Sequence, residues 1–234
     1  MINYAKYIKS IYWLLLFSMN TILKFRTLHL LNHIILLFGI HQIFQTNTYL
    51  WFIVGVIFFI WFGIVGVNVS LHRYYAHKSF KTTKFKEKIL LWSSVFTGLG
   101  SPAMWCSVHR MHHAHSDTNK DPHNPRINGI IKTWFAIWPN MIIPKRFFVP
   151  FIRDDSMRWV HNNYFLINFT TLLILCLIDI RLAAMVCNIF IHHVCKISLC
   201  PTFHSRGKAV LLRACKPWML TGLMACNKFF AVGQ

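Results

Sequence analysis

Residues 109–123 read H-R-M-H-H-A-H-S-D-T-N-K-D-P-H, a stretch that contains five of the chain's 14 histidines. On a helix, positions i, i+3 and i+4 share one face, so we expect His109, His112 and His113 to present three imidazoles to one point. A nearby carboxylate can orient a metal-binding imidazole through the nitrogen that faces away from the metal. Two carboxylates follow closely, on Asp117 and Asp121. The pattern predicts a metal site; the alternative is a polar surface helix that is rich in histidine.

A second histidine pair lies upstream, where His72 and His77 bracket R-Y-Y-A. This H-x4-H spacing does not align on one face of an ideal α-helix, but it suits a helix end that bends toward a site. Alone, such a pair is ordinary in a polar segment near a membrane surface. Together, the two clusters indicate a metal centre much more strongly than either does alone.

The composition is that of a membrane protein. Of the 234 residues, 55% are hydrophobic and only 13% are charged, and the formal net charge is +19. Basic nucleic-acid-binding proteins are not usually this apolar, whereas basic loops at an anionic cytoplasmic membrane surface fit both properties. We therefore expect a lipid bilayer as a partner and no nucleic acid. The seven cysteines show no zinc-ribbon pairing and imply no disulfide framework.

The first predicted membrane hairpin lies between Arg26 and Arg73, where the sequence contains no Lys, Arg, Asp or Glu. This segment is long enough for two spans of about 20 residues. We place the spans near 28–44 and 49–71, with the polar turn Q-T-N-T between them. Residues 1–27 are expected to form an amphipathic segment that lies on the cytoplasmic side of the membrane.

A second hairpin is predicted near 164–178 and 182–194, where two apolar runs are separated by D-I-R.

Residues 126–162 mix tryptophans with basic residues, as interfacial segments do. Residues 89–108 are uncharged but are interrupted by G-L-G-S-P. They form either a third span or a helix buried in the protein at membrane depth.

The charge pattern predicts the orientation of these spans. Residues 72–88 hold six basic residues and a single acid, Glu87, and basic loops favour the cytoplasmic side. We therefore expect an all-α, multi-pass integral membrane fold with four transmembrane helices in two hairpins. A cytoplasmic helical cap would carry the histidines, and both termini would be cytoplasmic.

Three segments carry a resemblance to a known family. They are H-R-Y-Y-A-H-K-S-F (72–80), G-S-P-A-M-W-C-S-V-H-R-M-H-H (100–113) and S-D-T-N-K-D-P-H-N-P (116–125). These segments resemble the first two histidine boxes of the membrane-bound fatty acid desaturases, in the subgroup of stearoyl-CoA 9-desaturase and its bacterial relatives. The resemblance extends from about residue 62 to residue 193 and favours the buried-helix alternative for residues 89–108.

The resemblance implies a diiron centre that uses O2 to introduce a cis double bond, expected at position 9, into a saturated acyl chain. In the family, an Asn four residues before an additional ligand His acts through a bound water, as Asn188 and His192 would here. The other implied iron ligands are His72, His77, His109, His112 and His113. Arg110, Asp117, Asp121 and His123 are expected to support these ligands, and Trp105 and Pro122 to pack the site.

The resemblance also implies partners. Electrons would come from a separate carrier such as a ferredoxin or a cytochrome b5-type protein. The expected substrate is an acyl-CoA or an acyl-lipid. Animal acyl-CoA members have an Arg-Asp pair where this chain has Ser107 and Val108, a departure that argues against CoA recognition and leaves an acyl-lipid or a carrier-protein substrate open. The expected role is unsaturated fatty acid biosynthesis in lipid metabolism.

Family members carry a third box, H-x2-H-H, which this sequence does not contain. Residues 195–234 form a basic tail that matches no family segment. One explanation is a frameshift or a truncation near residue 194; the other is a divergent tail in which Cys195, Cys200 or His204 supplies ligands. Three functions remain open at this point: an active desaturase, an inactive desaturase remnant in the membrane, and a membrane fatty acid hydroxylase.

Overall fold

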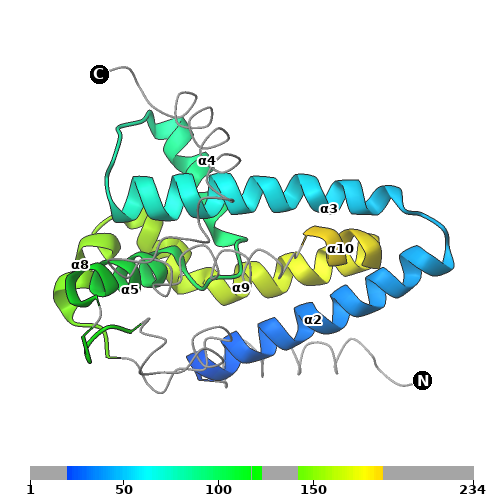
Figure 1. Cartoon of the computed structure of the whole chain (residues 1–234), viewed down its shortest axis with the longest axis horizontal. Helices are drawn as coiled ribbons and strands as arrows, with labels where there is room; N and C mark the ends of the chain where they lie inside the picture. Colours follow the sequence, from blue (N-terminus) through cyan, green and yellow to red (C-terminus); the bar gives the residue numbers. More distant parts are fainter. Residues whose placement is uncertain (1–19, 117, 123–141, 187–234) are drawn as a thin grey trace, which may run out of the picture.

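The computed structural model describes residues 20–116, 118–122 and 142–186. In these ranges the chain is helical and contains no strand, as predicted. Figure 1 shows the arrangement of the helices, which are α2 (Thr21–Gln45), α3 (Leu50–Ile60), the π-helix η2 (Trp61–Ala76), α4 (Lys84–Val95), α5 (Pro102–His115), α8 (Lys145–Ile152), α9 (Asp155–Ile178) and α10 (Ile180–Val186).

Within the described ranges, three helical segments are long and apolar enough to cross a membrane: Thr21–Gln45, Leu50–Ala76 and Asp155–Ile178. Each overlaps a predicted span and extends beyond it at one end or at both. The helix of the third span begins well before the predicted residue 164, because Asp154 caps it by accepting a hydrogen bond from the Met157 amide at 2.8 Å. The polar residues at its start, assigned from the sequence to an interfacial segment, therefore belong to the same continuous helix.

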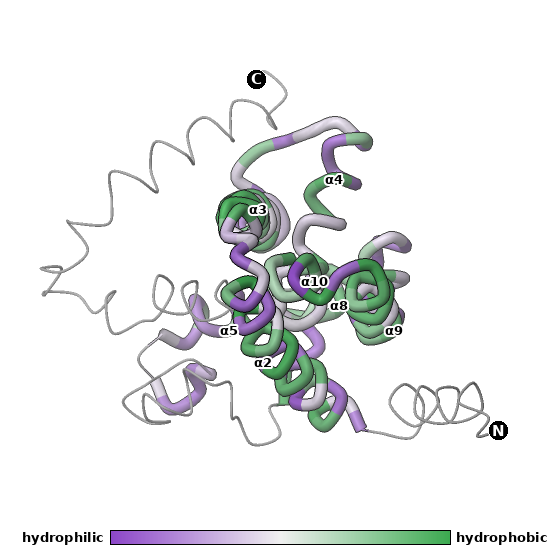
Figure 2. The backbone as a smooth tube through the Cα atoms, turned by 90° about the vertical axis from the view of Figure 1, so that its right-hand side faces the viewer, coloured by the Kyte–Doolittle hydropathy of each residue, from purple (hydrophilic) through white to green (hydrophobic). Residues whose placement is uncertain are grey.

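The outward faces of these segments are strongly apolar. Figure 2 shows hydrophobic residues along much of α2, α3 and α9. Many large apolar side chains on these helices are exposed, among them Leu30, Leu37, Leu50, Ile57 and Leu177. Because water would disfavour this surface, it fits a lipid environment.

The two predicted hairpin turns lie side by side at one end of the bundle. The Arg181 guanidinium, just after α9, donates hydrogen bonds to the hydroxyls of Thr46 and Thr48 in the α2–α3 turn, each at 3.3 Å. It also pairs with the Asp179 carboxylate at 2.6 Å. The first turn lies where the Q-T-N-T motif predicts it. Of the predicted fourth span, residues up to 186 are described and form α10, and residues 187–194 lie outside the described part.

Helix α10 packs closely against α2 and α3 because glycine and alanine leave room for it. A Cβ atom added at Gly39 of α2 would lie 2.3 Å from the Ala184 Cβ, and one added at Gly55 of α3 would lie 2.8 Å from the Met185 Sδ. Real Cβ atoms do not approach other atoms so closely. The short distance between these helices therefore depends on the missing side chains.

Residues 89–108 do not form a single span. Helix α4 ends at Val95, and α5 begins at Pro102, with Ser101 as its cap. Gly98 and Gly100 in the connection have φ angles of 73° and 93°, which other residues rarely adopt. Buried residues from both helices join the main core, so the segment corresponds to the buried-helix alternative.

Candidate metal centre

The π-helix η2 brings His72 and His77 together. The His77 amide donates a hydrogen bond to the His72 carbonyl oxygen, five residues back, at 3.0 Å. In an α-helix, residues five apart point about 140° away from each other around the axis, whereas a wider turn returns them to one face. The two rings accordingly have centroids 4.6 Å apart. The sequence predicted a bend at a helix end, but the structure has a wide helical turn there. This turn lets two histidines with the H-x4-H spacing share one face.

Helix α5 supplies two further histidines to the same point. His109 and His113 are one turn apart, and their Nε2 atoms lie 3.1 Å from each other. His109 Nε2 also lies 3.1 Å from His77 Nε2. The ligand atoms of these two residues and of the η2 pair all lie within 4.8 Å of one another. We call these four residues, His72, His77, His109 and His113, the four-histidine group.

The distances in this group fit a metal ion. Metal–imidazole bonds are about 2.1 Å long, so two nitrogens on one metal lie about 3.0 Å apart at a right angle and about 3.4 Å apart at a tetrahedral angle. The 3.1 Å separations fall within this range. A single proton on His109 Nε2 can bridge to only one of its two neighbours. A shared metal ion would satisfy all three nitrogens at once.

The protonation of the group also suits metal binding. Burial, followed by the nearby His72, His113, His77 and His112, lowers the pKa of His109 to about 2. Burial and then the Arg110 charge lower the pKa of His77. Both imidazoles are therefore neutral at pH 7, which is the form that ligates metal ions.

Trp105 forms one wall of the site. Its indole stacks on the His109 ring, with centroids 4.8 Å apart and planes inclined by 11°. His109 is only 7% exposed. The predicted packing role of Trp105 is therefore visible as a direct ring contact.

His112 does not join the four-histidine group. Around a helix axis, position i+4 lies about 40° to one side of position i, and position i+3 lies about 60° to the other. Of these two, only His113 joins His109 in the group, so the expected convergence of His112 with His109 and His113 on one point is wrong. Its Nδ1 instead pairs with the Asp121 carboxylate at 2.8 Å, and that carboxylate is fully buried.

Arg110 links the two helices that carry the group. Its guanidinium donates hydrogen bonds to the carbonyl oxygens of Ala76 at 2.9 Å and Tyr75 at 3.2 Å. It also lies over the ring of Phe151 in α8, 4.5 Å from the centroid. The last carbonyls of a helix lack partners within the helix, so Arg110 satisfies the end of η2 next to His77.

Two neighbours of the site were not predicted. The Tyr74 hydroxyl, between the two histidines of η2, donates a hydrogen bond to Glu87 of α4 at 3.0 Å. The signal in the sequence was the isolated position of Glu87 as the one acid among the basic residues of 72–88. Four predicted site residues lie outside the described part of the chain: Asp117, His123, Asn188 and His192.

Comparison with known proteins bears on this site. Residues 47–195 match the family model for fatty acid desaturases. The chain is 30% identical over 128 residues to a hex-5-enoyl-[acyl-carrier protein] acetylenase of Moorena producens (strain JHB), covering 47% of this chain and 39% of the relative. It is 36% identical over 108 residues to an acyl-CoA C20 Delta5-desaturase of Anemone leveillei, covering 44% and 33%.

A third relative is an sn-1 stearoyl-lipid 9-desaturase of Anabaena variabilis, 36% identical over 83 residues, with 35% of this chain and 30% of the relative covered. The chain therefore spans between 30% and 39% of the length of these relatives. The family match contains His72, His77 and all the described histidines of α5.

Proposed function

This chain belongs to the fatty acid desaturase family, and we propose that it introduces a cis double bond, at position 9, into a saturated fatty acyl chain with O2 and a diiron centre. The observation that carries the proposal is the four-histidine group, whose ligand atoms lie within 4.8 Å of one another. Imidazole-rich sites suit iron, whereas magnesium and calcium prefer oxygen ligands.

The residues divide between two metal ions. We assign the four-histidine group to the first iron, because four imidazoles already converge there. His112, which lies outside this group, is assigned to the second iron, with Asp121 holding its ring through Nδ1. His192 and Asn188, the latter through a water, would complete the second site. Asp117 and His123 are proposed to support the ligands.

The two irons, when bound, would supply the O2 chemistry that removes one hydrogen from each of two adjacent methylenes and forms water. The protein's own residues orient the ligands and exclude water. Trp105 covers His109, and Arg110 fixes the end of η2 against α5. Electrons would come from a separate carrier, such as a ferredoxin or a cytochrome b5-type protein.

The acyl carrier differs among the names of the relatives. The names of the relatives include acyl groups on acyl-carrier protein, on CoA and in a stearoyl-lipid. We propose an acyl-CoA or acyl-lipid substrate for this chain. The same assay with both substrates decides between them.

The test is iron content and desaturation of the full chain, purified in detergent after expression with ample iron. About two irons per chain and a mono-unsaturated product, formed with an added reductase and electron carrier, are expected. A folded, membrane-inserted protein with near-zero iron and no product would overturn the proposal and leave a desaturase remnant. A hydroxylated product would identify a hydroxylase instead.

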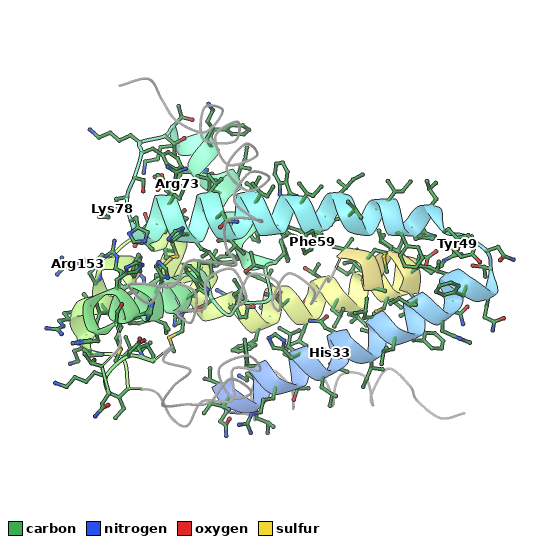
Figure 3. The ribbon with its side chains drawn as sticks, viewed as in Figure 1. His33, Tyr49, Phe59, Arg73, Lys78 and Arg153 are labelled. Carbon is green, nitrogen blue, oxygen red and sulfur yellow. The ribbon has the colours of Figure 1, made fainter. Side chains whose placement is uncertain are left out.

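We propose four membrane spans with the histidines and both termini on the cytoplasmic side. Figure 3 supports this orientation because Arg73, Lys78 and Arg153 lie at the end of the bundle opposite Tyr49, and basic residues favour the cytoplasmic side. An epitope inserted after Asn47 is expected to bind antibody in intact cells. An epitope after Lys81 should bind only after the cytoplasmic membrane is permeabilised. The reverse pattern would contradict the orientation.

Replacing Asp121 by alanine is expected to weaken binding of the second metal by about 10- to 100-fold, because partners that orient a ligating histidine contribute this much. The measurement is competition with a chelator for Co2+, followed at both metal equivalents. Asp155→Ala removes an exposed carboxylate that pairs with Arg158 and should leave both affinities unchanged. Equal affinities in Asp121→Ala and the unmodified chain would exclude the assigned role.

A further inference from the structure

Glu87 contacts the wide helical turn that carries two ligands of the proposed metal centre. One carboxylate oxygen accepts the Tyr74 hydroxyl at 3.0 Å, and the other lies 3.0 Å from the Lys84 ammonium. Both oxygens therefore have a partner. Glu87 lies in the first turn of α4, where the unpaired amides of a helix favour negative charge. The carboxylate is thus held in place from its own helix.

The turn that Glu87 contacts determines whether His72 and His77 can share a metal. These two rings meet only because the backbone bonds from residue 77 to residue 72 instead of following the α-helical pattern. Such wide turns are rare and generally short in proteins, so a long one depends on outside contacts. Tyr74 projects from the middle of this turn, between the two histidines.

Tyr74 is held on several sides. Its ring lies 5.4 Å from the Phe80 ring and 4.8 Å from the Tyr75 ring, measured between centroids. The Tyr75 hydroxyl makes a longer contact, at 3.5 Å, with the carbonyl oxygen of Glu87. Both tyrosines of the R-Y-Y-A segment therefore contact Glu87 in the first turn of α4.

The opposite side of the same segment is held by α5. Arg110 binds the carbonyl oxygens of Tyr75 and Ala76 from that side. The segment between the two ligands thus lies between an acid from α4 and a base from α5. Metal ligands lose affinity when their supporting groups allow displacements of about half an ångström.

We propose that Glu87 is a positioning residue, which acts through Tyr74 to hold His72 and His77 in line with His109 and His113. The inference rests on the proposed metal centre and extends it to α4, a helix that supplies no ligand. Glu87 would not touch the metal or the substrate. Its role is to keep the wide turn in the shape that the first metal needs.

The test is a Co2+ titration of the full chain in detergent, read by the visible absorption of bound Co2+ and by chelator competition. Glu87→Ala and Tyr74→Phe are each expected to weaken binding at the first site by about 10- to 100-fold and to change the Co2+ spectrum. The double variant should lose no more than either single variant, because both remove the same hydrogen bond. Glu87→Gln should restore the affinity, since its amide oxygen still accepts the Tyr74 hydroxyl.

Lys84→Ala is the matched control. It removes the other partner of the same carboxylate, but its side chain is 89% exposed, and its affinity and spectrum should equal those of the unmodified chain. Wild-type affinity and spectrum in folded Tyr74→Phe and Glu87→Ala would overturn the inference. Loss in Glu87→Ala without recovery in Glu87→Gln would also overturn it.

Hydrogen exchange over residues 72–80 in the metal-free chain separates this inference from the proposed function. If the unmodified chain binds no Co2+, the proposed metal centre fails, and exchange still reports on Glu87. Faster exchange in Glu87→Ala than in Lys84→Ala supports the positioning role. Equal exchange in these two variants overturns it.

Discussion

Replacing His109 by alanine is expected to abolish metal binding by the four-histidine group and, with it, any desaturation. His109 is the most buried member of the group, and its Nε2 lies 3.1 Å from both His77 and His113. Removing it would delete the ligand that the others surround and open the space beneath Trp105. Because even a supporting partner is worth about 10- to 100-fold in affinity, a loss of more than about 100-fold is expected for this direct ligand.

The measurement is the number and affinity of Co2+ ions bound, with thermal unfolding as a check on folding. His115→Ala is the matched control because His115 lies on the same helix, outside the group, where it faces Arg146 at 3.3 Å. It should bind as much metal as the unmodified chain. Full binding by folded His109→Ala would exclude the four-histidine group as a metal site.

Replacing Gly39 by alanine should destabilise the protein even though alanine is the better helix former. The new methyl group would lie 2.3 Å from the Ala184 Cβ and 3.1 Å from the Ile180 carbonyl oxygen. Overpacking of this kind costs about 1–3 kcal/mol, which exceeds the gain of up to about 1 kcal/mol from replacing a helical glycine. A lower temperature of thermal unfolding in detergent is therefore expected.

Two variants make this test specific. A Cβ at Gly63 would meet no atom within 4 Å, so Gly63→Ala should leave the unfolding temperature equal or higher. Ala184→Gly removes the atom that the new methyl group meets, and it should recover part of the stability in the Gly39→Ala background. An equal effect of alanine at both glycines would show that α2 and α10 do not pack as described.

Local sequence patterns predicted much of the fold, because the lack of charged residues and the position of polar turn residues decide where a chain can cross a membrane. The uncharged segment between Arg26 and Arg73 identified the first hairpin, and Q-T-N-T placed its turn. The starts of helices depended on single caps such as Asp154, which an average over apolar residues does not detect. For this reason, the predicted span 164–178 is shorter than α9, which contains it.

The site was predicted less completely because its geometry depends on contacts between distant segments. Four of the five described candidate ligands converge, as the histidine pattern suggested. The wide turn of η2 cannot be derived from H-x4-H alone, since that spacing disfavours an α-helical site. Helix geometry placed His112 on the same face as His109 and His113, so its exclusion from the four-histidine group and its pairing with Asp121 required the folded chain. The contact of Glu87 with Tyr74 joins residues 13 positions apart.

The contacts of Arg181 with Thr46 and Thr48 have a mechanical consequence. They hold the C-terminal end of α9 against the α2–α3 turn, at the end of the bundle remote from the histidines. If α9 tilts relative to α2 and α3, it therefore rotates about this point. Helix α9 has 24 residues, which corresponds to a lever arm of about 36 Å. A tilt of about 5° around that fulcrum would move its other end by about 3 Å while leaving the pinned turns almost still. Any tilt of these helices relative to one another is therefore amplified on the side where the imidazoles lie.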